Sequence, residues 1–323
     1  MAEQKFIRTC SIWRALEIVG DTSTLLVLEA CLIGARRFDD IRVRSELLPT
    51  LLSSRLSRLV EAGILEKRRY TDKPPRHEYR LTEKGRDLYW TALMMLRWEH
   101  KWAPRDGKLD IRLRHRTCGQ LFEPVPTCLC CKEEISARDV DWTEGPGVGW
   151  MAIRYSRRRR LRHAASERSG ETALMDEVAQ ITGDRWASLA LRSIFTGLRK
   201  FDEICRDTAM ATNILSERLS WLVEKGVIRL HEYSAIPRRF EYRLTDKGID
   251  YYPVLLMLLQ WGDKYYLSPE GPPLLLRHGA DGHELQPAVT CSCCGEPVSL
   301  LEVDYEVVEP QRPSVQADSA KAS

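Results

Sequence analysis

The chain lacks any apolar stretch long enough to cross a membrane. Its most apolar run lies at 251–261, whereas a spanning helix needs about 20 residues. The N-terminal segment mixes acidic and basic side chains and has no continuous apolar core, so it does not match a secretory signal. We therefore expect a cytoplasmic protein with no membrane partner, associated with the nucleoid if it binds DNA.

The usual signatures of an enzyme are missing as well. No phosphate-binding glycine loop is present, and none of the seven histidines stands in a recognisable nucleophile–base setting. The net charge of +3 over 323 residues is too small to indicate nucleic-acid binding by itself. We expect no catalytic activity.

What the chain does have is an internal repeat. A shift of 163 positions carries Phe38-Asp39-Asp40-Ile41 onto Phe201-Asp202-Glu203-Ile204, and Tyr79-Arg80-Leu81-Thr82 onto Tyr242-Arg243-Leu244-Thr245. The alignment needs no insertion or deletion between Gly20 and Cys131. An offset held for that long indicates two copies of one globular module rather than a short solenoid repeat.

Each copy is predicted to be mainly α-helical with one small β-hairpin. In the first copy, helices are expected at 10–19, 22–33, 38–44, 50–62 and 82–102, with strands at 64–70 and 76–81. In the second copy, the third helix is expected at 211–225 and the hairpin at 231–242. This order of elements is that of a winged helix-turn-helix, so the fold class is two tandem winged helix-turn-helix domains, each followed by a short Cys-rich extension.

The domain boundaries follow from composition. We expect winged helix domain 1 at 1–105, Cys-rich extension 1 at 106–144, a basic linker at 145–171, winged helix domain 2 at 172–267, Cys-rich extension 2 at 268–309 and a disordered tail at 310–323. The linker contains Arg157-Arg158-Arg159-Arg160, which fits either phosphate contact or a merely solvated segment.

The third helix of each copy carries a short-chained, hydrogen-bonding face opposite a leucine stripe. Such residues fit the major groove and can bond base edges, although an ordinary surface helix is the alternative. Basic residues in the following hairpin suit phosphate or minor-groove contact. The candidate DNA-binding residues are Thr50, Ser53, Ser54, Ser57, Arg58, Lys73 and Arg76 in the first copy, and Thr212, Asn213, Ser216, Arg218, Ser220, Arg238 and Arg239 in the second. We also expect Glu217 and Trp221 on the exposed face of the second third-helix.

Several segments resemble HxlR-type winged-helix transcriptional regulators. They are Cys10-Ser11-Ile12, Arg37-Phe38-Asp39-Asp40-Ile41, Pro74-Pro75-Arg76-His77-Glu78-Tyr79-Arg80-Leu81-Thr82-Glu83-Lys84-Gly85, Gly183-Asp184-Arg185-Trp186 and Ala211-Thr212-Asn213-Ile214-Leu215. The resemblance covers most of both modules. It implies a bacterial DNA-binding regulator that works as a homodimer, with terminal helices pairing the subunits and each third helix entering the major groove.

The long helix after each hairpin suggests how the two copies are arranged. The stretch at 251–261 is apolar on nearly every face, and Leu93-Met94-Met95-Leu96 with Trp98 is similar. A helix apolar all round needs burial on more than one side, although a position central to its own core would also satisfy it. Because two copies share one chain, we expect each long helix to self-associate with the other in a tethered pseudo-dimer.

Two Cys-x-Cys-Cys clusters stand at equivalent positions and match the spacing of a zinc knuckle. For the first copy we expect structural Zn²⁺ on His115, Cys118, Cys128 and Cys131. For the second copy we expect it on His278, His283, Cys291 and Cys294, a weaker set because Asp281 replaces the upstream cysteine. Thiol redox chemistry and simple burial of the cysteines are the alternatives.

Cys10 is a redox candidate. It matches the N-terminal cysteine that acts as an oxidant sensor in some HxlR-type proteins, but its counterpart here is Ala173, so a symmetric disulfide is not available. The alternative is a small buried apolar residue.

Three functions remain open from the sequence. The first is an HxlR-like regulator of double-stranded DNA with two non-identical modules. The second is a protein-interaction scaffold, favoured by Glu217 and Trp221 if both are exposed. The third is a thiol- or metal-responsive sensor that uses the winged helices as its output.

Overall fold

The structure, a computed structural model, describes residues 5–72, 76–103, 109–153 and 174–308. The tail expected at 310–323 and the arginine run at 157–160 lie outside the described residues. Among the described residues, no helix is long and apolar enough to cross a membrane.

The helices of the two copies occur in the same order, and two of them begin at equivalent side-chain caps in both copies. Asp21 and Asp184 cap the second helix of each copy, and Thr82 and Thr245 cap the short helix after each wing. The first copy has α1 Ser11–Val19, α2 Thr22–Leu32, α3 Phe38–Ser45, α4 Pro49–Glu61, α5 Glu83–Arg86 and α6 Tyr89–Trp102. The second has α7 Asp176–Thr182, α8 Arg185–Phe195, α9 Phe201–Thr208, α10 Thr212–Glu224, α11 Asp246–Ile249 and α12 Tyr252–Tyr266. The single helix predicted at 82–102 is therefore two helices, α5 and α6.

The two hairpin wings also form as predicted, at β2 Leu65–Thr71 with β3 Arg76–Leu81 and at β9 Ile228–Ala235 with β10 Arg238–Leu244. The remaining strands were not foreseen. They are β1 Lys5–Arg8, β4 Asp110–His115, β5 Leu121–Phe122, β6 Pro124–Cys128, β7 Val140–Glu144, β8 Trp150–Ile153, β11 Leu274–His278, β12 His283–Glu284, β13 Pro287–Cys291 and β14 Val303–Val308, with a short 3₁₀ helix, η1, at Leu300–Glu302.

Strand β8 corrects the expected linker at 145–171. It pairs antiparallel with β1 at the start of the chain, so residues 150–153 belong to the folded module. The composition of this stretch is rich in turn residues, which concealed a strand whose partner lies far away in sequence.

The Cys-rich extensions exchange strands between the two copies. Strand β4 of the first copy pairs with β14 of the second, and β11 of the second pairs with β7 of the first. Between them β6 and β13 pair across the centre, where the hydroxyls of Thr127 and Thr290, which are 163 residues apart, lie 2.7 Å from each other. Equivalent residues that meet in this way indicate an approximate twofold axis at this point.

The helices repeat the exchange. Helix α1 packs on α12 of the other copy, α7 packs on α6, and α6 and α12 contact each other. The indole N–H of Trp98 donates to the carbonyl of Lys247 at 3.0 Å, and that of Trp261 donates to Lys84 at 2.9 Å. The carboxylate of Glu99 accepts the backbone amide of Val178 at 2.8 Å and so caps the start of α7. The buried apolar residues of both copies form one continuous core.

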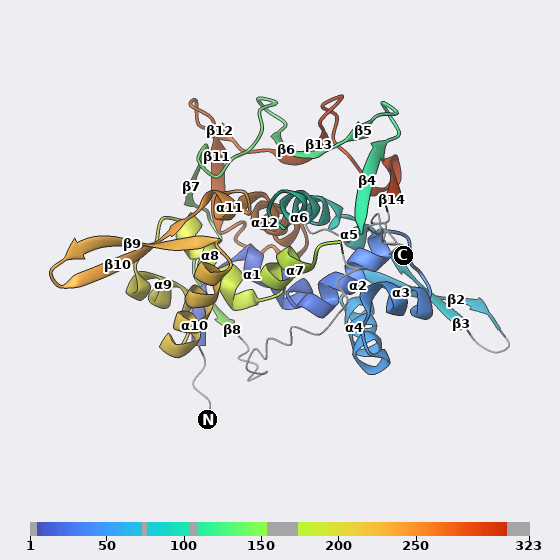
Figure 1. Cartoon of the computed structure of the whole chain (residues 1–323), viewed down its shortest axis with the longest axis horizontal. Helices are drawn as coiled ribbons and strands as arrows, with labels where there is room; N and C mark the ends of the chain where they lie inside the picture. The colour runs from blue at the N-terminus through green and yellow to red at the C-terminus, as the bar shows by residue number, and fades with distance from the viewer. Residues whose placement is uncertain (1–4, 73–75, 104–108, 154–173, 309–323) are drawn as a thin grey trace, which may run out of the picture.

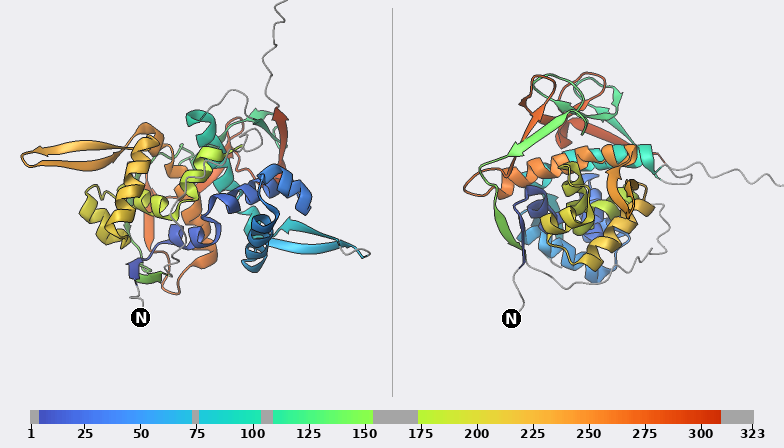
Figure 2. Two further views of the ribbon diagram at one scale, coloured as in Figure 1. Left: turned by 60° about the horizontal axis from the view of Figure 1, so that its bottom comes forward. Right: turned by 90° about the vertical axis from the view of Figure 1, so that its left-hand side faces the viewer.

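Three layers result. The exchanged strands of the extensions form a roof, α6 and α12 lie side by side beneath it, and the winged helices form the opposite layer (Figure 1, Figure 2). The wings β2–β3 and β9–β10 point away from each other at the two ends, and α4 and α10 lie on the side away from the roof (Figure 1).

Candidate nucleic-acid interface and metal clusters

Helices α4 and α10 present the polar faces that the leucine pattern predicts. Their leucine stripes are buried, because Leu52, Leu56 and Leu59 pack inward, as do their counterparts Leu215, Leu219 and Leu222. The exposed residues on these helices include Thr50, Ser53, Ser54, Ser57 and Arg58 on α4, and Thr212, Asn213, Ser216, Glu217 and Ser220 on α10. Apart from Arg58 and Glu217, these side chains have hydroxyl or amide groups of the kind that bond base edges.

An aspartate–arginine pair links α4 to the N-terminus of α2, and an equivalent pair links α10 to the N-terminus of α8. Asp21, the N-cap of α2, accepts Arg55 Nε at 2.8 Å, and Asp184, the N-cap of α8, accepts Arg218 Nε at 2.6 Å. The second pair is almost fully buried. Burial raises the pKa of the Asp184 carboxyl, and the charge of Arg218 opposes that shift.

Arg218 is therefore wrongly placed among the DNA-contacting residues. The helical period put it near the exposed face, but its guanidinium turns inward because the buried carboxylate of Asp184 needs a counter-charge. The repeat contained the signal for this role, since Asp and Arg recur in both copies as Asp21 with Arg55 and as Asp184 with Arg218.

The expected exposure of Trp221 is also wrong. Its side chain is buried in the second module, where indole burial outweighs the polar pattern of the helix. Its counterpart Arg58 is exposed, but it donates to the carbonyl of Glu17 at 3.2 Å and pairs with Asp21 at 3.5 Å. Glu217 is exposed and pairs with Arg218 at 3.0 Å, so its charge is partly balanced.

The wings differ in their tips. On the first wing, Arg76 is exposed, while Lys73 lies outside the described residues. On the second wing, Arg238 and Arg239 are exposed, Arg238 pairs with Glu232 at 2.9 Å, and Ile236 at the turn is 93% exposed. This apolar turn is followed directly by two arginines, which suit contact with the anionic phosphates along a DNA groove.

The eight predicted metal ligands come together, but in sets that cross between the copies. One cluster contains His115 and Cys118 of the first copy with Cys291 and Cys294 of the second. The other contains Cys128 and Cys131 of the first copy with His278 and His283 of the second. The within-copy ligand sets expected from the sequence are thus corrected. The exchanged strands β4–β14 and β11–β7, with β6–β13 between them, carry each knuckle to the other copy's histidine.

The distances within each cluster fit a tetrahedral ion. Zn–S bonds of about 2.3 Å and Zn–N bonds of about 2.0–2.1 Å place neighbouring ligand atoms roughly 3.5–3.8 Å apart. In the first cluster, Cys294 Sγ lies 3.3 Å and Cys118 Sγ 3.8 Å from His115 Nδ1, and the Cys118 and Cys291 sulfurs are 3.8 Å apart. In the second cluster, Cys128 Sγ lies 3.3 Å from His283 Nε2, and Cys131 Sγ lies 3.4 Å from His278 Nδ1.

The surroundings of the second cluster favour a metal-binding state. Asp281, which stands where the first copy has a cysteine, accepts His283 Nδ1 at 2.7 Å and so directs Nε2 toward Cys128. This hydrogen bond raises the pKa of His283. Burial opposes ionisation of Cys128, yet backbone hydrogen bonds at Gln286 and Cys131 and the contact with His283 lower its pKa to about 6.

The cysteines outside the clusters have other surroundings. Cys10 is buried and its sulfur accepts the backbone amide of Trp13 at 3.4 Å, at the N-cap of α1. Burial raises the pKa of Cys31 to about 12. Cys130 and Cys293 are exposed at the tips of the knuckles and belong to neither cluster.

Comparisons with known proteins agree with this architecture. The HxlR-like helix-turn-helix family matches the chain twice, at residues 18–107 and 181–270, together more than half of its length. The uncharacterized HTH-type transcriptional regulator Rv3095 of Mycobacterium tuberculosis is 44% identical over 137 residues, which are 42% of this chain and 87% of that protein. The uncharacterized HTH-type transcriptional regulator YdeP of Bacillus subtilis is 30% identical over 110 residues, 34% of this chain and 86% of that protein. Each relative therefore corresponds in length to about one copy.

Among solved structures, the crystal structure of PA1607, a putative transcription factor, is similar with 34% identity and a TM-score of 0.35, and covers 39% of this chain and 90% of that one. The putative transcription factor PA1374 from Pseudomonas aeruginosa matches with 32% identity and a TM-score of 0.24, over 43% of this chain and 88% of that one.

Proposed function

Because the chain belongs to the HxlR-like helix-turn-helix family, whose curated relatives are transcriptional regulators rather than enzymes, we propose that it is a cytoplasmic transcriptional regulator that binds duplex DNA as an intramolecular pseudo-dimer. Its two winged helices contact two adjacent half-sites through α4 and α10. The observation that carries this proposal is the pair of exposed polar helix faces on the side away from the roof, each anchored to its module by an aspartate–arginine pair.

The two reading faces are not identical, so the operator is asymmetric. Asn213 stands where α4 has Thr50, and Glu217 stands where α4 has Ser54. An asparagine amide can bond the N6 and N7 atoms of adenine in a bidentate way, which a threonine hydroxyl cannot do. The half-site under α10 is therefore expected to require an adenine that the half-site under α4 does not require.

The burial of Trp221 weakens the alternative of a protein-interaction scaffold, because that tryptophan was the residue expected to serve as an interface anchor. Glu217, the acidic group that would repel phosphate, has a cationic partner in Arg218. Neither Glu217 nor Trp221 therefore gives strong support to the scaffold alternative.

Two structural zinc ions belong to this proposal, one in each cluster. The first is held by His115, Cys118, Cys291 and Cys294, and the second by Cys128, Cys131, His278 and His283. Zinc supplies no chemistry beyond cross-linking. Because each ligand set draws on both copies, each ion would tie the two modules together and would hold α4 and α10 at a fixed separation.

The proposal is tested by genome-wide mapping of bound DNA followed by footprinting of the mapped sites. We expect a protected region with two half-sites about one helical turn, about 10 bp, apart. Weak, uniform protection that disappears with moderate salt would contradict sequence-specific regulation.

A matched pair of variants tests the division between the modules. Asn213→Ala should weaken binding by about 1–3 kcal/mol and relax base preference in one half-site only. Thr50→Ala, the equivalent change in the first copy, should act on the other half-site. Loss of protection at both half-sites with either variant would refute the asymmetric operator.

A further inference from the structure

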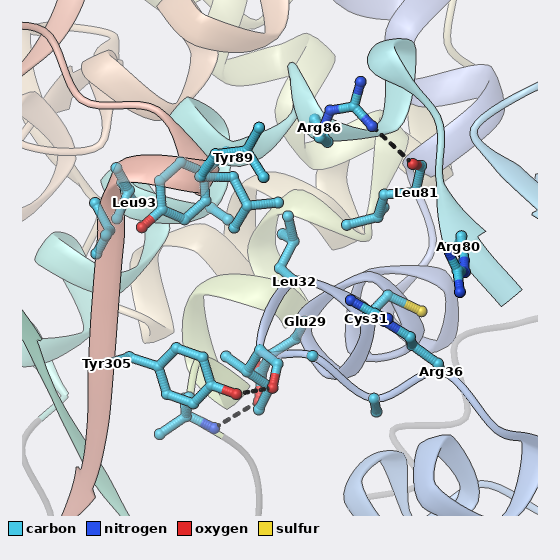
Figure 3. A pocket seen from close by; sticks show the side chains of 18 of the residues that line it. Glu29, Cys31, Leu32, Arg36, Arg80, Leu81, Arg86, Tyr89, Leu93 and Tyr305 are labelled. Carbon is cyan, nitrogen blue, oxygen red and sulfur yellow. Dashed lines mark hydrogen bonds between the residues drawn. The ribbon is translucent and has the colours of Figure 1, made fainter. Parts of the chain in front are cut away.

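The first copy contains a cavity that the regulator function does not explain. It has a volume of about 460 Å³ and lies between the first winged helix and the extension of the second copy (Figure 3). Its walls come from α2, α6 and the wing strands β2 and β3 on one side, and from η1 and β14 on the other. Most of the lining is apolar, with Leu32 and Leu93 among its buried members.

The same place in the second copy is nearly filled. The corresponding cavity has about 50 Å³, and every residue that lines it is the 163-residue counterpart of a residue lining the large one. Phe195 replaces Leu32, Leu255 replaces Ala92, and Trp142 replaces Tyr305. Each replacement is larger. The fold therefore tolerates a filled cavity at this position, and the first copy keeps it open.

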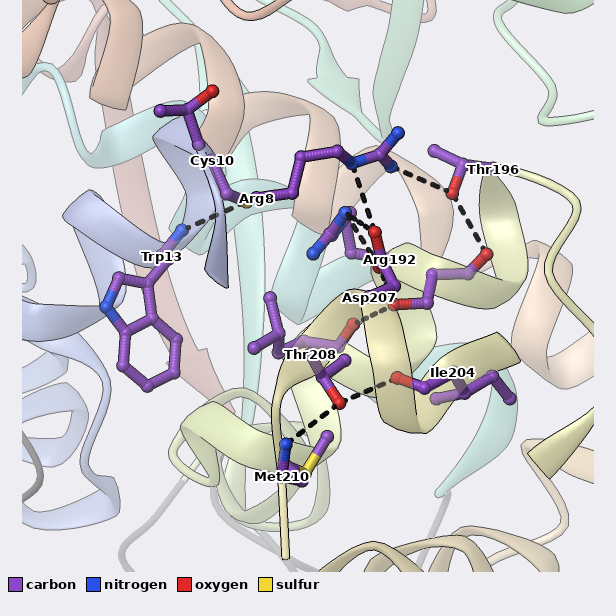
Figure 4. A network of polar contacts seen from close by, with 12 residues as sticks. Arg8, Cys10, Trp13, Arg192, Thr196, Ile204, Asp207, Thr208 and Met210 are labelled. Atoms are coloured by element: carbon purple, nitrogen blue, oxygen red, sulfur yellow. Dashed lines mark hydrogen bonds and ion pairs between the residues drawn. The ribbon is translucent and has the colours of Figure 1, made fainter. Parts of the chain in front are cut away.

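A network of polar contacts lies beside the small cavity of the second copy and helps to close it (Figure 4). Asp207 pairs with Arg192 at 2.9 Å and with Arg8 at 3.1 Å, and the Arg8 guanidinium lies 5.5 Å from the centre of the Trp142 ring. The counterparts of Asp207 and Arg192 are Arg44 and Glu29, with opposite charges. Glu29 accepts the backbone amide of Leu174 at 3.0 Å instead.

The charged groups around the large cavity are mainly basic. Arg86 donates to the carbonyl of Leu81 at 3.1 Å, and Arg80 pairs with Glu78 at 2.6 Å. The exposed side chain of Arg36, also in the lining, has no ion-pair partner within the described part of the chain. An apolar cavity with the guanidinium of Arg36 at its edge suits a ligand that has an apolar body and one anionic group.

We propose that this cavity binds a small apolar carboxylate, aromatic or aliphatic, as an effector of the regulator. The body of the ligand contacts Leu32, Ala92 and Leu93, and its carboxylate pairs with Arg36. The role as an effector rests on the proposed DNA-binding function. The cavity is placed for that role because its lining includes Arg80 of the wing and Tyr305 of the other copy's extension, whose hydroxyl donates to the carbonyl of Ile33.

The two copies supply the test variants. Leu32→Phe combined with Ala92→Leu introduces the side chains that already stand at 195 and 255, so the fold should be retained. Binding of octanoate and phenylpropionate is measured by titration calorimetry on the full chain without DNA. We expect one saturable site for at least one of these probes in the parent protein and none in the double variant, with unchanged near-UV circular dichroism in both.

The carboxylate contact has its own matched pair. Arg36→Ala should weaken probe binding about tenfold or more and leave the affinity of the neutral analogues octanol and phenylpropionamide unchanged. Arg199→Ala, the equivalent change in the filled copy, should leave every affinity unchanged. Absence of binding of both carboxylates, binding that survives in the double variant, or equal effects of Arg36→Ala and Arg199→Ala would each overturn the proposal.

DNA binding is measured separately on the mapped sites, with and without the probe that binds. A chain that binds the carboxylate but no specific DNA would contradict the proposed function and leave the ligand site standing. Specific DNA binding with no carboxylate site would do the reverse. An identical DNA affinity with and without a bound probe would overturn the effector role.

Discussion

Removing two cysteines from one metal cluster should have a different effect from removing one cysteine from each cluster. Cys118→Ser with Cys291→Ser disables a single cluster, although the two residues belong to different copies. Cys118→Ser with Cys128→Ser disables both clusters, although the two residues belong to the same extension. We expect about one zinc ion per chain in the first double variant and none in the second, against two in the parent protein.

The variant that loses both clusters should also be less stable than the variant that loses one. Structural zinc in zinc-finger peptides contributes about 10–16 kcal/mol at neutral pH. We take about 4 kcal/mol of that as net stability per site. With an unfolding entropy of about 2.1 cal/mol/K per residue over 323 residues, Tm falls by roughly 6 °C when one site is lost and by about twice as much when both are lost. Zinc is quantified by mass spectrometry on reduced protein, and Tm by differential scanning calorimetry.

The controls are Cys130→Ser and Cys293→Ser, which change exposed thiols in the same two knuckles outside the clusters. Both should keep two zinc ions and the parent Tm. The reverse result, with zinc absent from the Cys118/Cys291 variant and one ion retained in the Cys118/Cys128 variant, would show that each copy completes its own site. That outcome would refute the crossed arrangement.

Two further predictions concern buried groups. Arg218→Ala leaves the carboxylate of Asp184 buried without its partner and should lower the free energy of unfolding, measured in urea, by about 3–5 kcal/mol. Arg55→Ala removes one member of a more exposed pair and should lower the free energy of unfolding by clearly less. Equal losses would argue against the role of burial. Because burial raises the pKa of Cys31 to about 12, its thiolate is scarce at neutral pH, so iodoacetamide should modify Cys130 and leave Cys31 intact until the chain unfolds, as peptide mass spectrometry would show. Fast labelling of Cys31 in the native protein would contradict this.

Much of the fold could be predicted from the sequence because its signals are local. The leucine stripe of 215, 219 and 222 and the two strand segments of the first wing each act within a few residues. The repeat then confirmed each signal a second time. These features identified the tandem winged helices, a fold that the family comparison supports.

The contacts between the copies could not be derived in this way. Strand β4 pairs with β14, which lies more than half the length of the chain further on, and alternation within either strand does not identify its partner. For the same reason, ligand spacing identified all eight metal-binding candidates but assigned them to the wrong sets. Helical periodicity likewise places Arg218 on a face but does not show that Asp184 lies within reach of its long side chain.

The large cavity could not be predicted from the sequence either, although the repeat contains size differences that correspond to it. Ala92 and Leu32 are smaller than their counterparts Leu255 and Phe195. A size difference between equivalent apolar residues becomes meaningful only when the residues are known to face one space, and that space is closed by Tyr305 from the other copy.

The exchange of strands between the extensions has a consequence for the order in which the chain is made. Strand β4 and His115 leave the ribosome long before β14 and Cys294, with which they are joined in the finished protein. Strand β4 of the first extension has no partner strand from the second copy until almost all of that copy has been translated. In that interval an unpaired strand edge and a set of thiols are exposed, so two nascent chains made side by side on one messenger can pair with each other.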